Sequence, residues 1–549
     1  LLRREEVESV AVCLLHSYVN PEHEQRVGAI LAEELPGIPI SLSAEVAPEF
    51  REYLRASTTV INAVIRPVVE RYLERIEQRL ADAGVQAKLL VMQSSGGVFG
   101  SDAAARKPVF MVESGPAAGV IASAHLGATL GRPDMLSFDM GGTTAKVGLI
   151  QGGRPSVTKD YNVGGHAGAG IGGLSLSGYP VRTPVVDLVE IGAGGGSIAW
   201  VDSGGLLRVG PQSAGADPGP ACYGRGGTQP TVTDANLVLG RVDAGNFAGG
   251  QMTLDVDAAR DAIAALGEEL GIAPVEMAEG IADVANAKMA QAIRTLTVEK
   301  GIEPRDFALV AAGGAGPMHA VFLARELGIA EVLVPRYPGA FSAWGMLETE
   351  VRKDASRAYF TALDDLDRED LGALLGELEA DGFAGLADEG IAGDTGRVEH
   401  ALDLRYISQE YTLTIPLTGA GEPLEDGFLE AVSGRFHAAH RTRFGHANPG
   451  APVEIVTVRS TALGDLGRAE PASLDGASDG AYASETRPVT FGRRTDDAAI
   501  VRRDDLGRGA VVDGPAVITE QTATTVVPPG ARATVDQFGT LVVSVGEEA

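Results

Sequence analysis

A pair of glycine-rich turns, each placed where a β-strand is predicted to end, constrains the fold of this chain more than any other feature of its sequence. The first turn is Asp139-Met-Gly-Gly-Thr-Thr144 and the second is Gly313-Gly-Ala-Gly316. Glycine has no Cβ, so such turns can bring backbone N–H groups against an anion or let a helix pack closely on a sheet. Together they favour an α/β fold with a nucleotide site at the strand ends.

The first turn lies between two apolar runs, which predicts a β-hairpin over residues 135–150. Threonine hydroxyls and glycine N–H groups suit phosphate oxygens as hydrogen-bond donors. The residues predicted to contact phosphate are Gly141, Gly142, Thr143, Thr144 and Lys146. Asp139 is suited to hold Mg²⁺ through water or to orient an attacking group, because hard cations prefer oxygen ligands. An ordinary tight hairpin with a solvent-facing aspartate, and a solvated Lys146, are the alternatives.

The second turn follows the apolar segment 307–312 and precedes a helix that is predicted to begin near Pro317. A nucleotide base or ribose can lie against its glycines. The residues predicted to do so are Gly313, Gly314 and Gly316. Close packing of a helix on a strand requires the same glycines, so it remains the alternative. His319, in the first helical turn, is predicted to be a buried structural histidine rather than a catalytic one.

Composition limits the class of protein. The 549 residues suffice for three or four domains, and 44% hydrophobic with 22% charged residues indicates a globular protein. The 45 basic and 74 acidic residues give a net charge of −29, which disfavours binding to nucleic acid or to an anionic membrane. Only Cys13 and Cys222 are present, which excludes a disulfide framework and favours a cytoplasmic protein. The start at Leu1 predicts that the sequence is a fragment.

Local patterning predicts three consecutive regions. Residues 1–125 alternate strand-like runs with helices, residues 126–355 carry the glycine turns, and residues 356–549 form an α+β domain rich in strands. A long helix is predicted over Arg55–Ala83. Its apolar residues at helical spacing are Val60, Val64, Val68, Leu73, Ile76 and Leu80. The stretch 465–487, rich in Ala, Ser, Gly and Asp, is predicted to be an exposed loop.

The order of these elements resembles the superfold of actin, sugar kinases and heat-shock chaperones, whose two ribonuclease H-like lobes close over ATP. The resemblance implies that the hairpin is the second phosphate loop, that 313–316 is the adenosine loop, and that 339–345 is a connecting helix. It also implies ATP and Mg²⁺ as cofactors, with Asp139 at the metal. The run 113–119 resembles the other connecting helix, in which Glu113 would act as a catalytic base or serve only as a surface or capping residue.

Several longer strings resemble the A subunits of the hydantoinase and oxoprolinase family. They are Ser43–Tyr53, Met92–Gly97, Val186–Trp200 and Ser213–Gly224. The resemblance implies that ATP phosphorylates the carbonyl oxygen of a cyclic amide of the hydantoin, N-methylhydantoin or 5-oxoproline type, which water then opens. It also implies an oligomer with a hydantoinase B-type partner subunit. Related ketone carboxylases, whose substrate is a ketone, provide the second hypothesis.

The same strings supply candidate substrate residues. These are Asp187, Glu190, Gly194, Gly195 and Asp217. Alternation along a strand places Asp187 and Glu190 on opposite faces, so the two should not act as a pair. With no Cys or His partner at metal spacing, a structural loop is favoured for Asp217 and Cys222.

Two departures from the family pattern bear on function. Relatives carry a further Asp-x-Gly-Gly-Thr hairpin, and none precedes residue 138 here, so the fragment is expected to hydrolyse ATP poorly if at all. A non-catalytic nucleotide-binding scaffold is therefore the third hypothesis. Lys146 stands where many hydantoinase-type members have an acidic residue, which resembles the ketone carboxylases.

Overall fold

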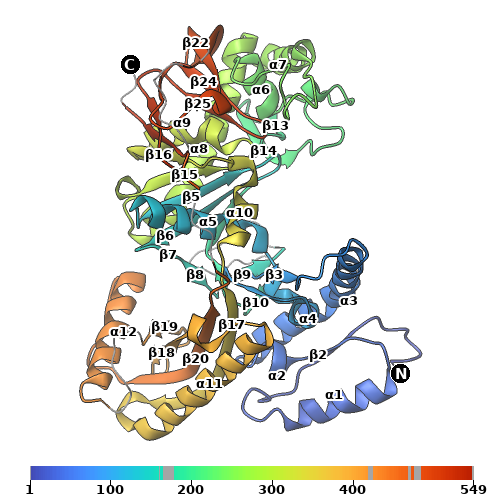
Figure 1. Cartoon of the computed structure of the whole chain (residues 1–549), viewed down its shortest axis with the longest axis vertical. Helices are drawn as coiled ribbons and strands as arrows, with labels where there is room; N and C mark the ends of the chain where they lie inside the picture. Colours follow the sequence, from blue (N-terminus) through green and yellow to red (C-terminus); the bar gives the residue numbers. More distant parts are fainter. Residues whose placement is uncertain are drawn as a thin grey trace. The chain divides into compact units, whose positions relative to one another are not determined.

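The computed structural model describes residues 2–159, 161–164, 178–417, 425–467, 472–474, 482 and 484–546. The chain divides into two compact units, each assembled from three stretches of sequence that can be followed by colour in Figure 1. Unit 1 comprises Leu1–Ser114, Val157–Val185 and Thr349–Arg468, and unit 2 comprises Gly115–Ser156, Val186–Glu348 and Ala469–Ala549.

This division differs from the three consecutive domains predicted over residues 1–125, 126–355 and 356–549. The C-terminal third is shared between the units, because its first half belongs to unit 1 and its second half to unit 2. The predicted boundaries followed local changes in composition. Pairing between strands that are hundreds of residues apart depends on tertiary contacts, which local composition does not report.

A large mixed sheet organises unit 2. Within the described residues it has nine strands, in the order β12-β6-β5-β15-β16-β27-β26-β23, with β7 paired to β6. The strands are β5 (Met135–Met140), β6 (Ala145–Gln151), β7 (Arg154–Pro155), β12 (Leu188–Ile191), β15 (Ala308–Ala312), β16 (Glu331–Val334), β23 (Val511–Asp513), β26 (Arg532–Val535) and β27 (Leu541–Ser544).

The first five strands of this sheet have the ribonuclease H-like arrangement. β12, β6 and β5 are antiparallel, and β5, β15 and β16 are parallel, so that by chain order the strands run 3-2-1-4-5. All five residues of β15 are buried, as expected for a central parallel strand covered on both faces. The predicted α/β class and the predicted hairpin are confirmed.

Helices cover this sheet. They are α5 (Ser114–Leu130), α6 (Val232–Val238), α7 (Val256–Leu270), α8 (Pro274–Leu296), α9 (Gly316–Leu327) and α10 (Phe341–Leu347). α8 contacts β6 and β12 with a buried apolar stripe at helical spacing that includes Met277, Ile281, Met289 and Ile293. The start of α6 is fixed by a capping box between Thr231 and Asp234.

Two smaller sheets complete unit 2. A four-stranded sheet runs in the order β21-β22-β24-β25, with β21 (Ser484–Phe491), β22 (Arg494–Arg502), β24 (Ala516–Thr519) and β25 (Thr524–Val527), and a ribbon pairs β13 (Ser197–Val201) with β14 (Leu207–Ser213). β25 contacts α9. Much of the loop predicted over residues 465–487 lies outside the described residues, and β21 begins inside that range.

Unit 1 is built on a six-stranded sheet in the order β19-β18-β20-β17-β4-β3. Its strands are β3 (Leu90–Met92), β4 (Val98–Gly100), β17 (Val351–Ala362), β18 (Gly396–Tyr406), β19 (Leu413–Pro416) and β20 (Val453–Gly464). α11 (Arg368–Asp388) and α12 (Phe428–Phe444) share one apolar core with this sheet.

The N-terminal part of unit 1 combines a parallel strand pair with helices. Its elements are β1 (Val10–Val12), β2 (Ile40–Leu42), α1 (Glu22–Glu34), α2 (Ser43–Val46), α3 (Glu52–Asp82), α4 (Ser101–Arg106), β9 (Tyr161–Val163) and β10 (Tyr179–Val181). The long helix predicted over Arg55–Ala83 is α3. Its valines do not form the core face, because Val60, Val64 and Val68 are 50%, 66% and 62% exposed.

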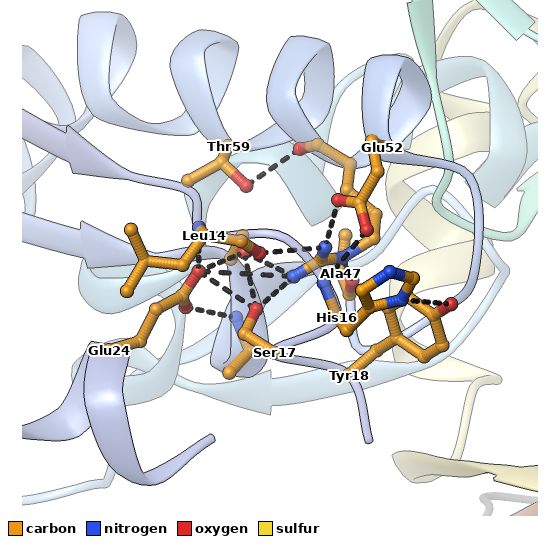
Figure 2. Close-up of polar contacts among 11 residues, drawn as sticks. Leu14, His16, Ser17, Tyr18, Glu24, Ala47, Glu52 and Thr59 are labelled. Atoms are coloured by element: carbon orange, nitrogen blue, oxygen red, sulfur yellow. Dashed lines mark hydrogen bonds and ion pairs between the residues drawn. The ribbon is translucent and has the colours of Figure 1, made fainter. Parts of the chain in front are cut away.

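The inward face of α3 is polar. Arg55 is fully buried, and its guanidinium donates to Ser17 and Ser43 and to the carbonyl oxygen of Leu14. Glu24, also fully buried, accepts the N–H of Leu14 at 2.6 Å (Figure 2). Burial raises the pKa of Glu24, but hydrogen bonds from Ser43 and its neighbours outweigh burial and leave that pKa below its usual value. We call these residues the Arg55 cluster.

Candidate functional site

The two glycine turns leave the same edge of the large sheet of unit 2. β5 and β15 are adjacent and parallel, and Asp139 is opposite Ala312 in the register. Their carboxyl ends therefore lie side by side, and the turns 141–144 and 313–316 both begin there. In open α/β sheets, ligands bind at the carboxyl ends of the strands.

The hairpin turn exposes backbone donors. The N–H of Gly141 closes the turn on the carbonyl oxygen of Thr144 at 3.1 Å. Gly142 and Thr143 are exposed, and within the described part of the chain their N–H groups take part in no hydrogen bond. A methyl group on Gly142 would meet no atom within 4 Å. Exposed backbone N–H groups of this kind can bind an anion.

Gly313 must be glycine. Its φ is +80°, and a methyl group at this position would lie 2.3 Å from the carbonyl oxygen of Met140 and 2.4 Å from Oδ1 of Asp139. The N–H of Ala315 donates to the same Met140 carbonyl at 3.0 Å, so the second turn is tied to the end of β5. Gly316 begins α9 and is buried, whereas Gly314 is exposed.

Asp139 lies at the meeting point of both turns with two helices. Its Oδ2 accepts a hydrogen bond from the hydroxyl of Ser342 at 3.2 Å. Burial raises the pKa of the Asp139 carboxyl, and Ser342 and Lys146 only partly oppose that effect. Ser342 was not predicted from the sequence, because a single serine on a short helix carries no motif.

The helices behind Asp139 approach each other through glycines. A methyl group on Gly119 of α5 would lie 2.9 Å from Oγ of Ser342, and one on Gly345 of α10 would lie 2.0 Å from the carbonyl oxygen of Ala118. The two helices therefore cross closely, and this crossing holds Ser342 against Asp139.

Lys146 and Glu190 extend the site across the sheet. In the register Asp139 is opposite Lys146, and Lys146 is opposite Glu190, so all three side chains share one face. Lys146 Nζ lies 3.7 Å from Oε1 of Glu190. Asp187 instead forms an ion pair with Lys300. The two acids have separate partners, in agreement with the alternation argument.

The glycines predicted to contact substrate, Gly194 and Gly195, pack against the hairpin turn. Gly194 and Gly195 are buried, the N–H of Gly194 donates to Ser197 Oγ at 2.8 Å, and the N–H of Gly195 donates to the carbonyl oxygen of Gly141 at 3.0 Å. A methyl group on Gly194 would lie 2.5 Å from the backbone of Thr143. These glycines permit close approach of two backbones, which the sequence pattern does not distinguish from anion binding.

Lys288, on α8, holds this supporting loop. Its ammonium donates to the carbonyl oxygen of Gly192 at 2.9 Å and to that of Val209 at 3.3 Å. Burial lowers its pKa. Lys288 was not predicted from the sequence, since a lysine in an amphipathic helix is ordinarily solvated.

The remaining candidates lie away from the turns or have other contacts. Asp217 is exposed, and Cys222 is buried with its thiol pKa raised by burial and by the nearby Asp234 carboxylate, which excludes a reactive thiolate. His319 is buried between Asn286 and Asn236, and burial, with the charge of Arg241, lowers its pKa to about 3. Its predicted structural role agrees with these contacts.

Glu113 belongs to unit 1, whereas Asp139 belongs to unit 2. Glu113 has a φ of +62°, and its carboxylate accepts the hydroxyl of Tyr161 at 3.4 Å. Positive φ outside glycine is uncommon and marks positions worth testing. A role for Glu113 as a base stays a prediction.

Within the described part of the chain, no group of three or more His, Cys, Asp or Glu side chains could hold a metal ion. Mg²⁺ commonly takes one or two carboxylates and completes its shell with water and phosphate oxygens, so a lone Asp139 fits that ion. None of the helices in the described residues is both long and apolar enough to cross a membrane.

Comparison with known proteins gives consistent matches along the chain. The family model described as Hydantoinase/oxoprolinase matches residues 55–355, its N-terminal-region model matches 1–35, and its C-terminal-domain model matches 455–543. An uncharacterized protein of Methanocaldococcus jannaschii is 42% identical over 98% of this chain and 78% of its own length. Caprolactamase subunit alpha of Pseudomonas jessenii is 36% identical over 99% of this chain and 77% of its own.

Solved structures agree with these matches. The crystal structure of the ATP-dependent caprolactamase from Pseudomonas jessenii has a TM-score of 0.85 at 34% identity and covers all of this chain and 78% of that one. A nucleotide-free structure of acetone carboxylase, from work on ATP-dependent acetone carboxylation, has a TM-score of 0.76 at 26% identity, over 99% of this chain and 77% of that one.

Proposed function

Since the chain belongs to the hydantoinase/oxoprolinase family, we propose that it is the nucleotide-binding subunit of an ATP-dependent hydrolase that opens a cyclic amide. The observation that carries the proposal is the pair of glycine turns that meet at Asp139 in unit 2. Similarity to an enzyme that is described as an ATP-dependent caprolactamase supports the reaction class.

The residues of unit 2 fit a triphosphate with Mg²⁺. Gly142 and Thr143 offer unbonded N–H groups, as judged from the described residues, and the threonine hydroxyls add donors beside them. Gly313 lets the second turn pack directly against Met140 and Asp139, where a side chain would collide, and the exposed Gly314 beside it would face the nucleoside. Asp139, oriented by Ser342, would hold Mg²⁺ through its carboxylate, while Lys146 balances charge on the same face.

The proposed ring-opening reaction needs ATP for a chemical reason. An unstrained amide is a poor electrophile, and a phosphate ester on its oxygen supplies the leaving group that positioning alone cannot supply. The role of this chain is then to bind and orient the phosphates, to keep water away from them, and to hold the metal-binding carboxylate in place. A hydantoinase B-type subunit is the proposed partner.

Nucleotide binding is tested first, without a partner. Calorimetric titration of the purified chain with ATP and Mg²⁺ should show one site, and Asp139→Asn should weaken the binding of Mg²⁺–ATP at least 10-fold while leaving metal-free ATP binding unchanged. Equal effects with and without Mg²⁺ would show that Asp139 does not hold the metal. No binding by the folded wild-type chain would contradict the proposal.

Turnover is tested next, with the partner subunit present. Phosphate release should depend on a lactam, hydantoin or 5-oxoproline, and Asp139→Asn should reduce the rate ~10²-fold or more, as for loss of a preorganised electrostatic contact. Lys146, at a position that resembles the ketone carboxylases, favours a second candidate function. Dependence on a ketone and bicarbonate would establish that function, and binding without turnover of either substrate would establish a scaffold.

A further inference from the structure

The turn between β24 and β25, residues 520–523, brings the C-terminal part of the chain against the second glycine turn of unit 2. β25 contacts α9, the helix that follows that glycine turn (Figure 1). β5, β15 and β16 are parallel, so the segments that follow these three strands leave the same edge of the sheet. The β24–β25 turn reaches this edge, although it is far from the glycine turns in the sequence.

Thr522, in the β24–β25 turn, lies against two exposed glycines at this edge. A methyl group on Gly314 would lie 3.1 Å from the carbonyl oxygen of Thr522, and one on Gly339 would lie 2.6 Å from its Cβ and next to its hydroxyl. The N–H of Gly313 donates to the carbonyl oxygen of Pro338 at 2.9 Å, so the segment that carries Gly339 is tied to the second glycine turn. Thr522 is itself exposed and therefore open to a ligand beside Gly314.

The β24–β25 turn is held in place on its other sides. The N–H of Glu520 donates to the carbonyl oxygen of Ala523 at 3.1 Å, which closes the turn. The side chain of Gln521 packs along Gly249, where a methyl group would lie 2.6 Å from Cγ of the glutamine. The position of Thr522 is therefore fixed by the protein before any ligand arrives, which is what a selective contact requires.

The polar groups of Thr522 and Gly314 have no partner in the protein. Among the described residues, neither the hydroxyl nor the carbonyl oxygen of Thr522 takes part in a hydrogen bond, and the N–H of Gly314 donates to no acceptor. Both residues are exposed. Two acceptors and one donor are thus available to a ligand at the edge of the sheet where the nucleoside is proposed to lie.

We propose that Thr522 selects the base of the nucleotide: its hydroxyl and carbonyl oxygens accept the two hydrogens of the adenine amino group, while the N–H of Gly314 donates to the adjacent ring nitrogen. The inference rests on the proposed function and deepens it, because it assigns the part of the site that distinguishes one nucleotide from another. Guanine has a carbonyl oxygen where adenine has its amino group, and hypoxanthine has the same oxygen. Two protein acceptors at that position therefore favour ATP over GTP and inosine triphosphate.

Equilibrium binding to the purified chain, with Mg²⁺ present, tests this selection. Calorimetric titration should show that ATP binds at least ~10-fold more tightly than inosine triphosphate, because the carbonyl oxygen of hypoxanthine would face the two acceptors of Thr522. Inorganic tripolyphosphate has no nucleoside, so its affinity reports the phosphate contacts alone.

Variants of Thr522 assign the contact. Thr522→Val keeps the branched side chain that packs on Gly339 but removes the hydroxyl, so it should weaken ATP about 5-fold and leave inosine triphosphate and tripolyphosphate unchanged. Thr522→Ser should retain the wild-type preference for ATP. The matched control is Thr534→Val, at a partly exposed position on β26, which should change none of the three affinities.

The three ligands separate this inference from the nucleotide proposal. If the folded wild-type chain binds neither ATP nor tripolyphosphate, the nucleotide proposal fails and the role of Thr522 falls with it. If ATP binds but inosine triphosphate binds equally well, the inference about Thr522 is overturned while the phosphate contacts stand. A wild-type preference for ATP in Thr522→Val overturns it in the same way.

Discussion

The glycine turns of unit 2 and the Arg55 cluster of unit 1 differ in whether their polar groups have hydrogen-bond partners. At the turns, the backbone N–H groups of the exposed residues Gly142 and Thr143 have no hydrogen-bond partner among the described residues. In the cluster, the guanidinium of Arg55 and the carboxylate of Glu24 are fully buried and make several hydrogen bonds each. Unsatisfied donors are suited to binding, whereas satisfied ones hold a fold together.

The largest effect should come from breaking the Arg55 cluster. Arg55→Ala leaves the Glu24 carboxylate buried without its cation, which costs about 3–5 kcal/mol of unfolding free energy. Both tryptophans, Trp200 and Trp344, lie in unit 2, so tryptophan fluorescence follows unit 2 while circular dichroism follows both units. The variant should unfold earlier in urea by circular dichroism and be unchanged by fluorescence.

Arg75→Ala provides the matched control for this prediction, because Arg75 is an exposed arginine on the same helix. It should change neither signal measurably. A loss below about 1 kcal/mol in Arg55→Ala would show that the cluster contributes little and would remove the contrast between the two regions.

The second effect concerns Gly313. Gly313→Ala forces a side chain into left-handed backbone and against the Met140 carbonyl, which should destabilise unit 2 by about 1–3 kcal/mol and weaken ATP binding at least 10-fold. Fluorescence-monitored unfolding and calorimetry measure the two losses. Gly245→Ala, where a methyl group meets only an ordinary contact at 3.6 Å, should show neither. Unchanged stability in Gly313→Ala would mean that the turn can relax.

The third effect is a dependence on pH. The folded protein lowers the pKa of His319 to about 3, so the neutral ring stabilises unit 2 above the unfolded value of about 6.5 and that stability is lost as the pH falls below it. The loss should reach up to about 1.4 kcal/mol per pH unit. His319→Gln should flatten the fluorescence-detected stability between pH 7 and 5, whereas His23→Gln, at an exposed position in unit 1, should not.

The smallest predicted effect is a gain in the stability of unit 1. Gly376 lies inside α11, has no special φ, and a methyl group there would meet no atom within 4 Å. Gly376→Ala should therefore stabilise unit 1 by about 0.5–1 kcal/mol, because it only restricts the unfolded chain. The circular dichroism midpoint should rise and the fluorescence midpoint should stay fixed. A lower midpoint would show that α11 needs flexibility at this glycine.

A structural feature could be predicted from the sequence when the residues that cause it are neighbours in the chain. The hairpin at Asp139 and the turn at Gly313 were predicted because the requirement for glycine lies within the turn itself. The long helix α3 was predicted correctly, but its buried face was not predicted, since a periodic stripe of valines reports one face of a helix and not which face meets the protein. The helix buries Arg55 because Glu24, Ser17 and Ser43 provide partners for its guanidinium.

Residues whose partners are far away in the sequence were not predicted. Ser342 contacts a carboxylate two hundred positions earlier, and Lys288 reaches a carbonyl almost a hundred positions earlier. Neither side chain belongs to a motif, and each gains its role only from the spacing of helices around the sheet. Gly194 and Gly195 likewise contact residues that are distant in sequence, since Gly195 donates to Gly141 and Gly194 packs against Thr143, and their contact with substrate stays a prediction.

Strand β27 has a consequence for biosynthesis. It closes the edge of β16, although roughly 200 residues of chain lie between them. At ~5–20 residues per second a ribosome needs about 10–40 s to make that stretch. During this interval the nascent sheet ends in an unpaired apolar strand, which is a surface that chaperones protect and that aggregates when crowded. Slower translation or a premature stop before Leu541 should therefore reduce the soluble yield.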